Sequence, residues 1–290
     1  MIPTDFDYVR ARSLREALDA VGARDGVKVI AGGHSLLPMM KFRLVQPSKL
    51  VDIGGIEELR GIAEHRKGAR IGATTTYREM IGSQLLRERF PILAEAASVI
   101  GDRQVRNRGT VGGSVAHADP ASDMPAVMLV LGAEFVLRSK RGILPAAKRS
   151  VTASEFFQGA FTTALAEGEL LTEIILPGPP KGAGMAYVKH TAPASGYALA
   201  AAAAVVGRTR KTISHIQVAT TGVGESHRFV HAVQELVGTK GEPELVARIA
   251  ARAFEGVEIQ GDVHSPADHR RALASVMVRR AIEKALERAR

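Results

Sequence analysis

Two short stretches of the sequence combine paired glycines with a hydroxyl residue. In AGGHS (Ala31–Ser35) and TVGGS (Thr110–Ser114) the two glycines come directly after an apolar residue, and each stretch ends in serine. Glycine permits positive φ angles and lets a ligand approach the main chain closely, and consecutive backbone N–H groups in such a loop can bind an anion. We therefore interpret the two stretches as one shared site for the diphosphate of a dinucleotide. The alternative is two tight turns in which glycine serves geometry alone.

Neither stretch is one of the common nucleotide-binding motifs. No Gly-Lys-Ser/Thr follows either of them, which excludes a Walker A loop, and neither has the GxGxxG spacing of a Rossmann site. Asp123 precedes Pro125 at the start of an apolar segment, where it fits a helix N-cap or a hydrogen bond to the ligand. Asp119, before Pro120, fits a turn residue. His34 fits a phosphate donor or a neutral loop residue.

The elements that must position these residues alternate between short strands and helices. Ser13 and Glu16 have the spacing of a capping box, which predicts the start of a helix. Thr76 and Glu79 have the same spacing, and Pro91 suits the first turn of a further helix. The sequence predicts strands at 27–33, 49–55, 69–75, 133–139 and 169–177, and helices starting near 13 and 76 and spanning 90–100 and 123–132.

The second part of the chain begins after LPGPPKGAG (176–184), a stretch whose prolines and glycines indicate a linker. Strands are predicted at 185–190, 197–207 and 212–224, although the alanines of 197–207 favour a helix by propensity. Helices are predicted at 227–238, 243–254 and 266–290. Apolar residues in the last one predict that it packs on its own domain: Leu273, Val276, Met277, Ala281 and Leu286.

The order of these elements predicts an α+β protein with two domains. The boundaries fall at 1–177 for the larger domain, with two subdomains of about 1–55 and 56–177, at 178–184 for the linker, and at 185–290 for a smaller domain built from a three-stranded sheet with helices.

Composition excludes several classes of function. The 290 residues are 46% hydrophobic and 24% charged, which is typical of a soluble globular protein, and the amino-terminal residues lack the apolar segment of a signal peptide. The chain has no cysteine, so it holds no disulfide, no thiolate metal site and no cysteine-bound iron–sulfur cluster. We expect a cytoplasmic location. The net charge of +9 fits a polyanion, an anionic cofactor or a basic face for a protein partner, but only 4% of residues are aromatic, which disfavours base stacking on nucleic acid.

Five blocks of the sequence, in this order, resemble the flavin-binding medium subunits of molybdenum hydroxylases, and within them the aerobic carbon monoxide dehydrogenase group. The resemblance implies the FAD-binding fold of the vanillyl-alcohol oxidase and p-cresol methylhydroxylase type, with non-covalent FAD between the two N-terminal subdomains. The blocks are AGGHSLLPMMKFRLVQP, LVDI, RIGATTTY, IGDRQVRNRGTVGGSVAHADPASDMPA and FFQGAFTTALAEGELLTEIILP.

Carried over residue by residue, the resemblance implies a set of cofactor-binding positions and no catalytic or metal-binding residue in this chain. It places the diphosphate on the two glycine stretches and a cofactor-contacting carboxylate at Asp123, with looser matches elsewhere. The implied residues are Ala31, Gly32, Gly33, His34, Ser35, Leu36, Ile100, Thr110, Val111, Gly112, Gly113, Ser114, Asp123, Leu171 and Lys189.

Other residues near the implied site allow two interpretations each. Arg103, Arg106 and Arg108 form either a solvated loop or a docking face beside the flavin. Lys189 is either a surface residue or a charge that tempers the reduced flavin. Tyr187 and Tyr197 either shield one face of the ring or belong to the core.

The function implied by the resemblance is electron transfer within a larger enzyme. The resemblance implies two partners, a small subunit with [2Fe–2S] clusters and a large subunit with the molybdenum cofactor, assembled as a dimer of heterotrimers with at most peripheral contact with a membrane. The substrate (carbon monoxide, an aldehyde, a purine or an N-heterocycle) and the final acceptor stay open. The alternatives are a stand-alone FAD oxidase of the same fold and, on net charge alone, a basic nucleic-acid-binding protein.

Overall fold

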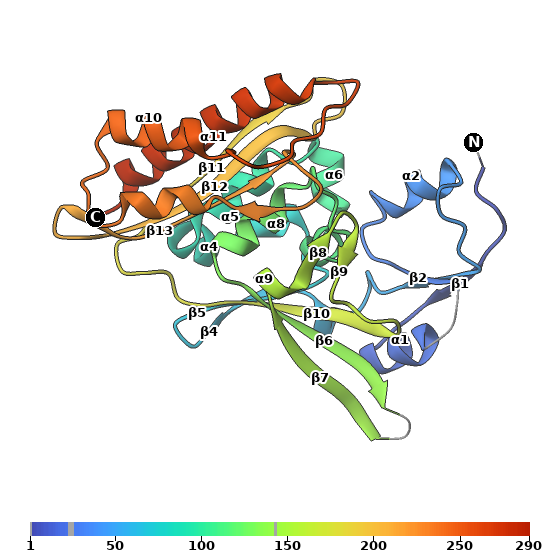
Figure 1. Ribbon diagram of the computed structural model, residues 1–290. Helices are drawn as coiled ribbons and strands as arrows, with labels where there is room; N and C mark the ends of the chain where they lie inside the picture. The colour runs from blue at the N-terminus through green and yellow to red at the C-terminus, as the bar shows by residue number, and fades with distance from the viewer. Residues whose placement is uncertain (1, 23–25, 142–143) are drawn as a thin grey trace.

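The first subdomain is a small parallel sheet with two helices. The structure is a computed structural model that describes all residues except 1, 23–25 and 142–143. Strands β1 (Asp7–Arg10), β3 (Lys49–Asp52) and β2 (Val27–Ile30) lie in that order. Helices α1 (Leu14–Val21) and α2 (Leu36–Lys41) connect them. The subdomain stands beside the rest of the molecule in Figure 1, so β2 and the residues after it face the larger body.

Helix α1 shows how local sequence sets a boundary. Ser13 is its N-cap, and the Ser13 hydroxyl accepts a hydrogen bond from the Glu16 N–H at 3.2 Å. The Glu16 carboxylate instead accepts from the N–H of Arg12 at 2.8 Å, so the capping box predicted here is only half formed. Leu14, Ala17, Leu18 and Val21 are buried, which is the spacing of one helical face.

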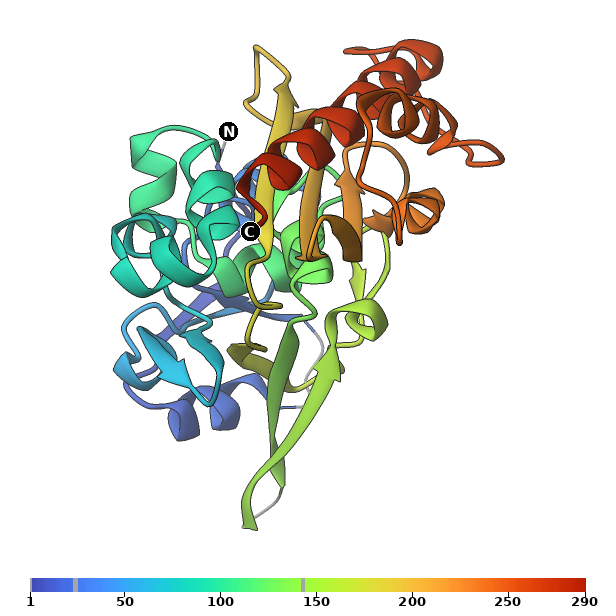
Figure 2. The same ribbon diagram turned by 90° about the vertical axis from the view of Figure 1, so that its left-hand side faces the viewer.

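The second subdomain combines a five-stranded antiparallel sheet with a group of short helices. The strand order is β4 (Ile62–His65), β5 (Gly68–Gly72), β10 (Glu169–Leu176), β6 (Glu134–Arg141) and β7 (Leu144–Thr152). The β6–β7 hairpin extends away from the body (Figure 2). The remaining elements are η1 (Glu57–Leu59), α3 (Tyr77–Gly82), α4 (Gln84–Arg89), α5 (Pro91–Ser98), α6 (Arg103–Arg108), α7 (Val111–His117), α8 (Asp123–Val130), α9 (Ala153–Phe156), β8 (Phe157–Gly159) and β9 (Thr162–Thr163).

Two helix starts in this subdomain confirm the sequence prediction. Thr76 and Glu79 form a complete capping box at α3, in which each side chain bonds to the backbone of the other. Pro91 occupies the first turn of α5, where its missing N–H leaves no helical bond unmade.

The C-terminal domain is an antiparallel sheet covered on one face by helices. Its strands are β11 (Gly184–Thr191), β12 (Ala198–Thr209), β13 (Thr212–Thr221) and the two-residue β14 (Arg228–Phe229), so the predicted three-stranded sheet has a short fourth strand. Helices α10 (Pro243–Arg252) and α11 (Ala267–Arg288) lie over its outer face (Figures 1 and 2). The helix predicted at 227–238 is wrong: β14 and the 3₁₀ helix η2 (His231–Leu236) occupy this range.

The alanine-rich strand β12 is buried on both faces. Ala200, Ala202 and Ala204 belong to the core beneath α10 and α11, whereas Ala201 and Ala203 belong to the core of the second subdomain. Successive side chains of a strand point to opposite faces, so small residues here let two layers approach one sheet. This double burial outweighs the helical propensity of alanine. None of the helices in the described part of the chain has the length and apolar composition that crossing a membrane requires.

Candidate functional site

A cleft of about 790 Å³ runs along the first subdomain and the body it faces. It is lined by the loop after β2, by the start of α7 and α8, and by Ser195–Tyr197 of the C-terminal domain. The structure brings together most of the expected cofactor residues, which is what a single elongated ligand requires. Those that line the cleft are Ala31, Gly32, Gly33, His34, Ser35, Leu36, Ile100, Thr110, Gly112, Gly113, Ser114, Asp123 and Leu171.

The two expected residues that do not line the cleft are Val111 and Lys189. Val111 is fully buried in the core of the second subdomain, so its side chain serves packing. Lys189 lies behind Asp123. Neither side chain therefore contacts the cleft directly: Val111 packs in the core, and Lys189 holds Asp123.

The first glycine stretch is a loop with free backbone donors. Gly33 has a φ of 77°, a conformation that glycine adopts without the steric cost of a side chain. Within the described residues, the backbone N–H groups from Gly32 to Leu36 have no protein acceptor. A row of unpaired N–H groups beside a cleft fits an anionic ligand, because buried or ligand-facing donors need an acceptor.

The second glycine stretch differs from the first, and the sequence interpretation of matching loops with bare donors is wrong here. Thr110 is the N-cap of helix α7, and its hydroxyl accepts from the Gly113 N–H at 3.2 Å. The Val111 N–H donates to Thr75 and the Gly112 N–H to Ala73, at 3.0 and 2.9 Å. What this stretch offers to the cleft is the Ser114 hydroxyl and a surface without side chains.

Glycine is required in both stretches for close packing. A Cβ on Gly112 would lie 2.5 Å from the Ala73 carbonyl oxygen, and a Cβ on Gly32 would lie 2.4 Å from that of Arg108. Both distances are far below a normal contact. The absence of a side chain at Gly32 thus lets the first loop touch the end of α6, immediately before the second stretch.

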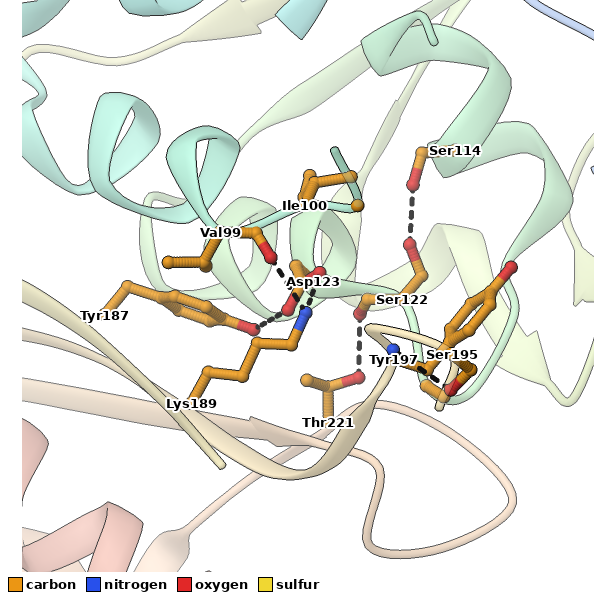
Figure 3. Close-up of polar contacts among 12 residues, drawn as sticks. Val99, Ile100, Ser114, Ser122, Asp123, Tyr187, Lys189, Ser195, Tyr197 and Thr221 are labelled. Atoms are coloured by element: carbon orange, nitrogen blue, oxygen red, sulfur yellow. Dashed lines mark hydrogen bonds and ion pairs between the residues drawn. The ribbon is translucent and has the colours of Figure 1, made fainter. Parts of the chain in front are cut away.

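Asp123, which lines the cleft, forms a buried ion pair with Lys189 behind it (Figure 3). The Asp123 carboxylate accepts hydrogen bonds from the Tyr187 hydroxyl at 2.5 Å and from Lys189 Nζ at 2.9 Å. Lys189 Nζ also donates to the Val99 carbonyl at 3.2 Å. The Asp123 and Lys189 side chains are 6% and 2% exposed, so the surface alternative for Lys189 is wrong. The N-cap alternative for Asp123 is also wrong: Ser122 is the N-cap of α8, and Asp123 is its first residue.

Burial sets the protonation of this cluster. It raises the pKa of Asp123, against the opposing effects of Lys189 and of the Tyr187 hydrogen bond. Burial, together with the neighbouring Asp123, raises the pKa of Tyr187 well above its usual value. Tyr187 is therefore a neutral phenol that donates to Asp123, and it belongs to the core. Tyr197 lines the cleft and is 44% exposed. Its side chain is therefore accessible to the ring of a ligand bound in the cleft.

Sequence reasoning missed an aromatic pair at the cleft. The rings of His117 and Phe161 lie 5.1 Å apart, and both residues line the cleft. Phe161 and Ala118 have φ angles of 54° and 49°, and the Phe161 N–H donates to the Ala118 carbonyl at 3.1 Å. A positive φ is an outlier for a bulky residue. No pattern in the sequence signals this contact, because it joins the end of α7 to the β8–β9 turn.

The arginine-rich segment is a helix, α6, rather than a loop. Asp102 caps it. Arg106 is half-buried and donates to the carbonyls of Ile100 and Gly101, both at 2.9 Å, so it stabilises the chain locally. Arg103 and Arg108 are exposed. The turn interpretation of Asp119 is confirmed, since its carboxylate accepts from the Ala121 N–H at 2.9 Å.

His227 is a buried histidine behind the cleft that should govern acid stability. Burial lowers its pKa to about 4, and its Nε2 lies 3.2 Å from the Ser122 carbonyl oxygen. The unfolded chain binds a proton at this residue near pH 6.5, but the folded chain does not, so stability is complete above that pH and falls as pH drops toward 4. We expect a loss of roughly 3 kcal/mol over this window.

The replacement His227→Gln should flatten that part of the stability profile, because glutamine can donate to Ser122 and does not titrate. Urea unfolding between about pH 7 and pH 4 measures it. His264→Gln, at an exposed position, is the control and should leave the profile unchanged. Identical acid limbs in both variants would assign the pH dependence to other groups.

Comparison with known proteins defines the class. The family model described as the FAD binding domain in molybdopterin dehydrogenase matches residues 4–179, and the model of the carbon monoxide dehydrogenase flavoprotein C-terminal domain matches residues 186–285. The chain belongs to this family of FAD-binding subunits, as the sequence blocks predicted, and it is a subunit of an oxidoreductase. The free donors of the first loop fit the diphosphate of FAD.

Similarity to particular relatives extends over the whole chain. It is 40% identical to the carbon monoxide dehydrogenase medium chain of Hydrogenophaga pseudoflava, over 99% of each chain, and 37% identical to the glyceraldehyde dehydrogenase medium chain of Sulfolobus acidocaldarius, over 99% of this chain and 97% of that one. A solved structure of carbon monoxide dehydrogenase from Hydrogenophaga pseudoflava superposes with a TM-score of 0.94 at 41% identity, covering 100% of both chains. The crystal structure of quinoline 2-oxidoreductase from Pseudomonas putida 86 superposes with 0.91 at 33% identity, covering 99% of both. These similarities confirm the predicted fold class.

Proposed function

We propose that this chain is the electron-transfer subunit of a molybdenum-containing hydroxylase or dehydrogenase. Bound FAD supplies two-electron redox chemistry with access to one-electron steps. Electrons would reach it from [2Fe–2S] clusters of a small partner subunit and leave for an external acceptor. The observation that carries the proposal is the first loop, whose N–H groups from Gly32 to Leu36 have no protein acceptor in the described structure and face the same cleft as Asp123.

Each part of the cleft has a distinct role in this proposal. The loop from Ala31 to Leu36 binds the diphosphate through its backbone, and the Ser114 hydroxyl adds a donor from the opposite wall. Asp123, held by Lys189 and Tyr187, accepts a hydrogen bond from the cofactor. Ile100 and Leu171 supply apolar contact and exclude water. Thr110, Gly112 and Gly113 form the wall that allows close approach.

The proposed assembly is a complex with two partners. Relatives with this fold are named medium chains of dehydrogenases, which implies other chains in those enzymes. A small cluster-bearing subunit and a large molybdenum-bearing subunit, paired as a dimer of heterotrimers, are the partners proposed here. The substrate is oxidised in the large subunit, so its identity is not determined by this chain. The cytoplasmic location also stays a prediction.

Purification from the native host tests this proposal. We expect two further chains to co-purify, one containing iron and sulfide and one containing molybdenum. The separated chain should be reduced by dithionite, reoxidise in air and oxidise no aldehyde, purine, N-heterocycle or carbon monoxide. A chain that purifies alone and turns over a small molecule at full rate would instead be a stand-alone flavin oxidase.

Helix α6 is the docking face proposed for the cluster-bearing partner. Charge reversal at Arg103 and Arg108 should slow electron transfer from the reduced partner about tenfold or more at low salt, because these exposed charges lie on the helix whose end contacts the first loop. FAD content should stay unchanged. Stopped-flow reduction of the flavin measures the rate.

The matched control reverses two exposed charges elsewhere. Arg210 and Lys211 lie on the turn between β12 and β13, and the Arg210→Glu/Lys211→Glu variant changes net charge by the same amount. Equal slowing in both double variants would mean that overall charge, rather than α6, guides the partner.

A further inference from the structure

The segment that leads into α8 is held by the C-terminal domain. The Pro120 carbonyl accepts hydrogen bonds from the Gly222 N–H and the Thr221 hydroxyl, both at 2.8 Å. The Ser122 carbonyl accepts from the same Thr221 hydroxyl at 2.7 Å and faces His227 Nε2 at 3.2 Å. The donors come from the end of β13 and the residues after it, about 100 residues further along the chain. The position of this segment is therefore set by another domain.

The same segment carries groups that face the cofactor cleft. The hydroxyl oxygens of Ser122 and Ser114 lie 2.6 Å apart, and this contact joins the start of α8 to helix α7. Ser114, Ser122 and Asp123 all line the cleft. Figure 3 shows the contacts from Thr221 through Ser122 to Ser114 beside the Asp123 cluster. Thr221 itself is buried at 1% exposure and does not line the cleft.

The Thr221 hydroxyl constrains the positions of the Pro120 and Ser122 carbonyls relative to each other. A threonine hydroxyl has one proton to donate, yet two carbonyl oxygens lie within 2.8 Å of it. Sharing one proton between them requires both oxygens to stay close to the same point. The hydroxyl thus fixes the two ends of the Pro120–Ser122 turn relative to each other and to the C-terminal sheet. Without it, each of these two partly buried carbonyls would lose one of its donors.

We propose that Thr221 is a positioning residue for the cofactor, acting through the Pro120–Ser122 turn on Ser122, Ser114 and Asp123. The inference rests on the proposed function, since it assumes that this cleft binds FAD. It assigns a part in cofactor affinity to a residue of the C-terminal domain that does not line the cleft.

The neighbouring residue supplies a matched control. Thr220 is also 1% exposed, and its hydroxyl has no hydrogen-bond partner among the described residues. Successive residues of a strand point to opposite faces, so Thr220 faces away from the turn. Valine has nearly the shape of threonine without the hydroxyl. Thr221→Val and Thr220→Val therefore remove the same atom from adjacent buried positions, and only one of them touches the turn.

The experiment compares Thr221→Val, Thr221→Ser and Thr220→Val in the full chain. Titration of the apoprotein with FAD should show affinity about tenfold lower for Thr221→Val, and within about twofold of wild type for the other two. The FAD that still binds to Thr221→Val should have a shifted midpoint potential and altered visible bands, because Ser122 and Asp123 have moved. A loss of fold stability alone would not change the potential of bound FAD.

Two results would overturn the inference, and they are distinguishable from failure of the proposed function. Equal affinities for Thr221→Val and Thr220→Val would show that the hydroxyl does not position the cofactor. A tenfold loss of FAD affinity in Thr221→Val with an unchanged midpoint potential of the bound FAD would show that Thr221 only stabilises the fold. A wild-type chain that binds no FAD at all would instead overturn the proposed function.

Discussion

Gly33→Val should lower the affinity for FAD at least about 100-fold, because two backbone donors to the diphosphate would be lost or displaced. Gly33 adopts a φ of 77°, and its missing Cβ would lie 3.1 Å from Leu37 and 3.3 Å from Ile30. A branched side chain is strained in this conformation and presses on the residues that hold the loop. The measurement is the FAD released by acid precipitation per mole of protein, together with a titration of the apoprotein.

The control for Gly33→Val applies the same backbone strain far from the cleft. Gly256 has a φ of 69° with open space around its missing Cβ, and it is exposed. Both valine variants should lose roughly 1–3 kcal/mol of stability, but only Gly33→Val should lose FAD. Wild-type affinity in a folded Gly33→Val protein would mean that the loop is a turn without a role in binding.

Lys189→Met should lower the free energy of unfolding of the apoprotein by about 3–5 kcal/mol, because it leaves a buried carboxylate without its cation. The Asp123 and Lys189 side chains are almost completely buried, so water cannot replace the missing partner. Denaturant unfolding measures the loss. The double variant Asp123→Asn/Lys189→Met should recover a large part of it, since no unpaired charge remains. Equal losses in the single and double variants would show that packing, rather than charge, explains the effect.

The same variant should change the dependence of stability on pH. Burial already raises the pKa of Asp123 above 3.8, and removal of Lys189 leaves burial less opposed, so the folded-state pKa should rise further. A carboxyl with a raised folded-state pKa contributes stability below its unfolded pKa and loses it as pH rises through the folded pKa. The deficit of Lys189→Met relative to wild type should therefore be smallest in acid and should grow as pH rises above 3.8, the ordinary pKa of an aspartate.

The sequence predicted the features that depend on neighbours along the chain. The position of the first loop after β2, the capping box at Thr76 and the proline at the start of α5 are local patterns, and the structure confirms them. The resemblance to the family predicted most of the residues that line the cleft. Within them, the glycines of AGGHS predicted the free donors correctly, because no other part of the chain supplies acceptors to that loop in the described structure.

Features that depend on distant parts of the chain were beyond sequence reasoning. The donors of TVGGS are used by Ala73 and Thr75, and nothing within the stretch signals that pairing. Asp123 is 66 residues from the lysine that pairs with it. The alanines of β12 form a strand because two cores meet on it. In each case a contact with a distant part of the chain determines the structure, and the local sequence does not reveal that contact.

The close contact between Gly32 and Arg108 has a thermodynamic consequence for the assembly. The loop proposed to bind the diphosphate and the helix proposed to receive the partner share one backbone contact, so we expect FAD binding and partner docking to be linked. Linkage is reciprocal: the factor by which bound FAD strengthens docking must equal the factor by which the docked partner strengthens FAD binding. If bound FAD strengthens docking, an assembly that has lost its flavin binds this subunit less tightly, and the free subunit binds flavin less tightly than the complex does.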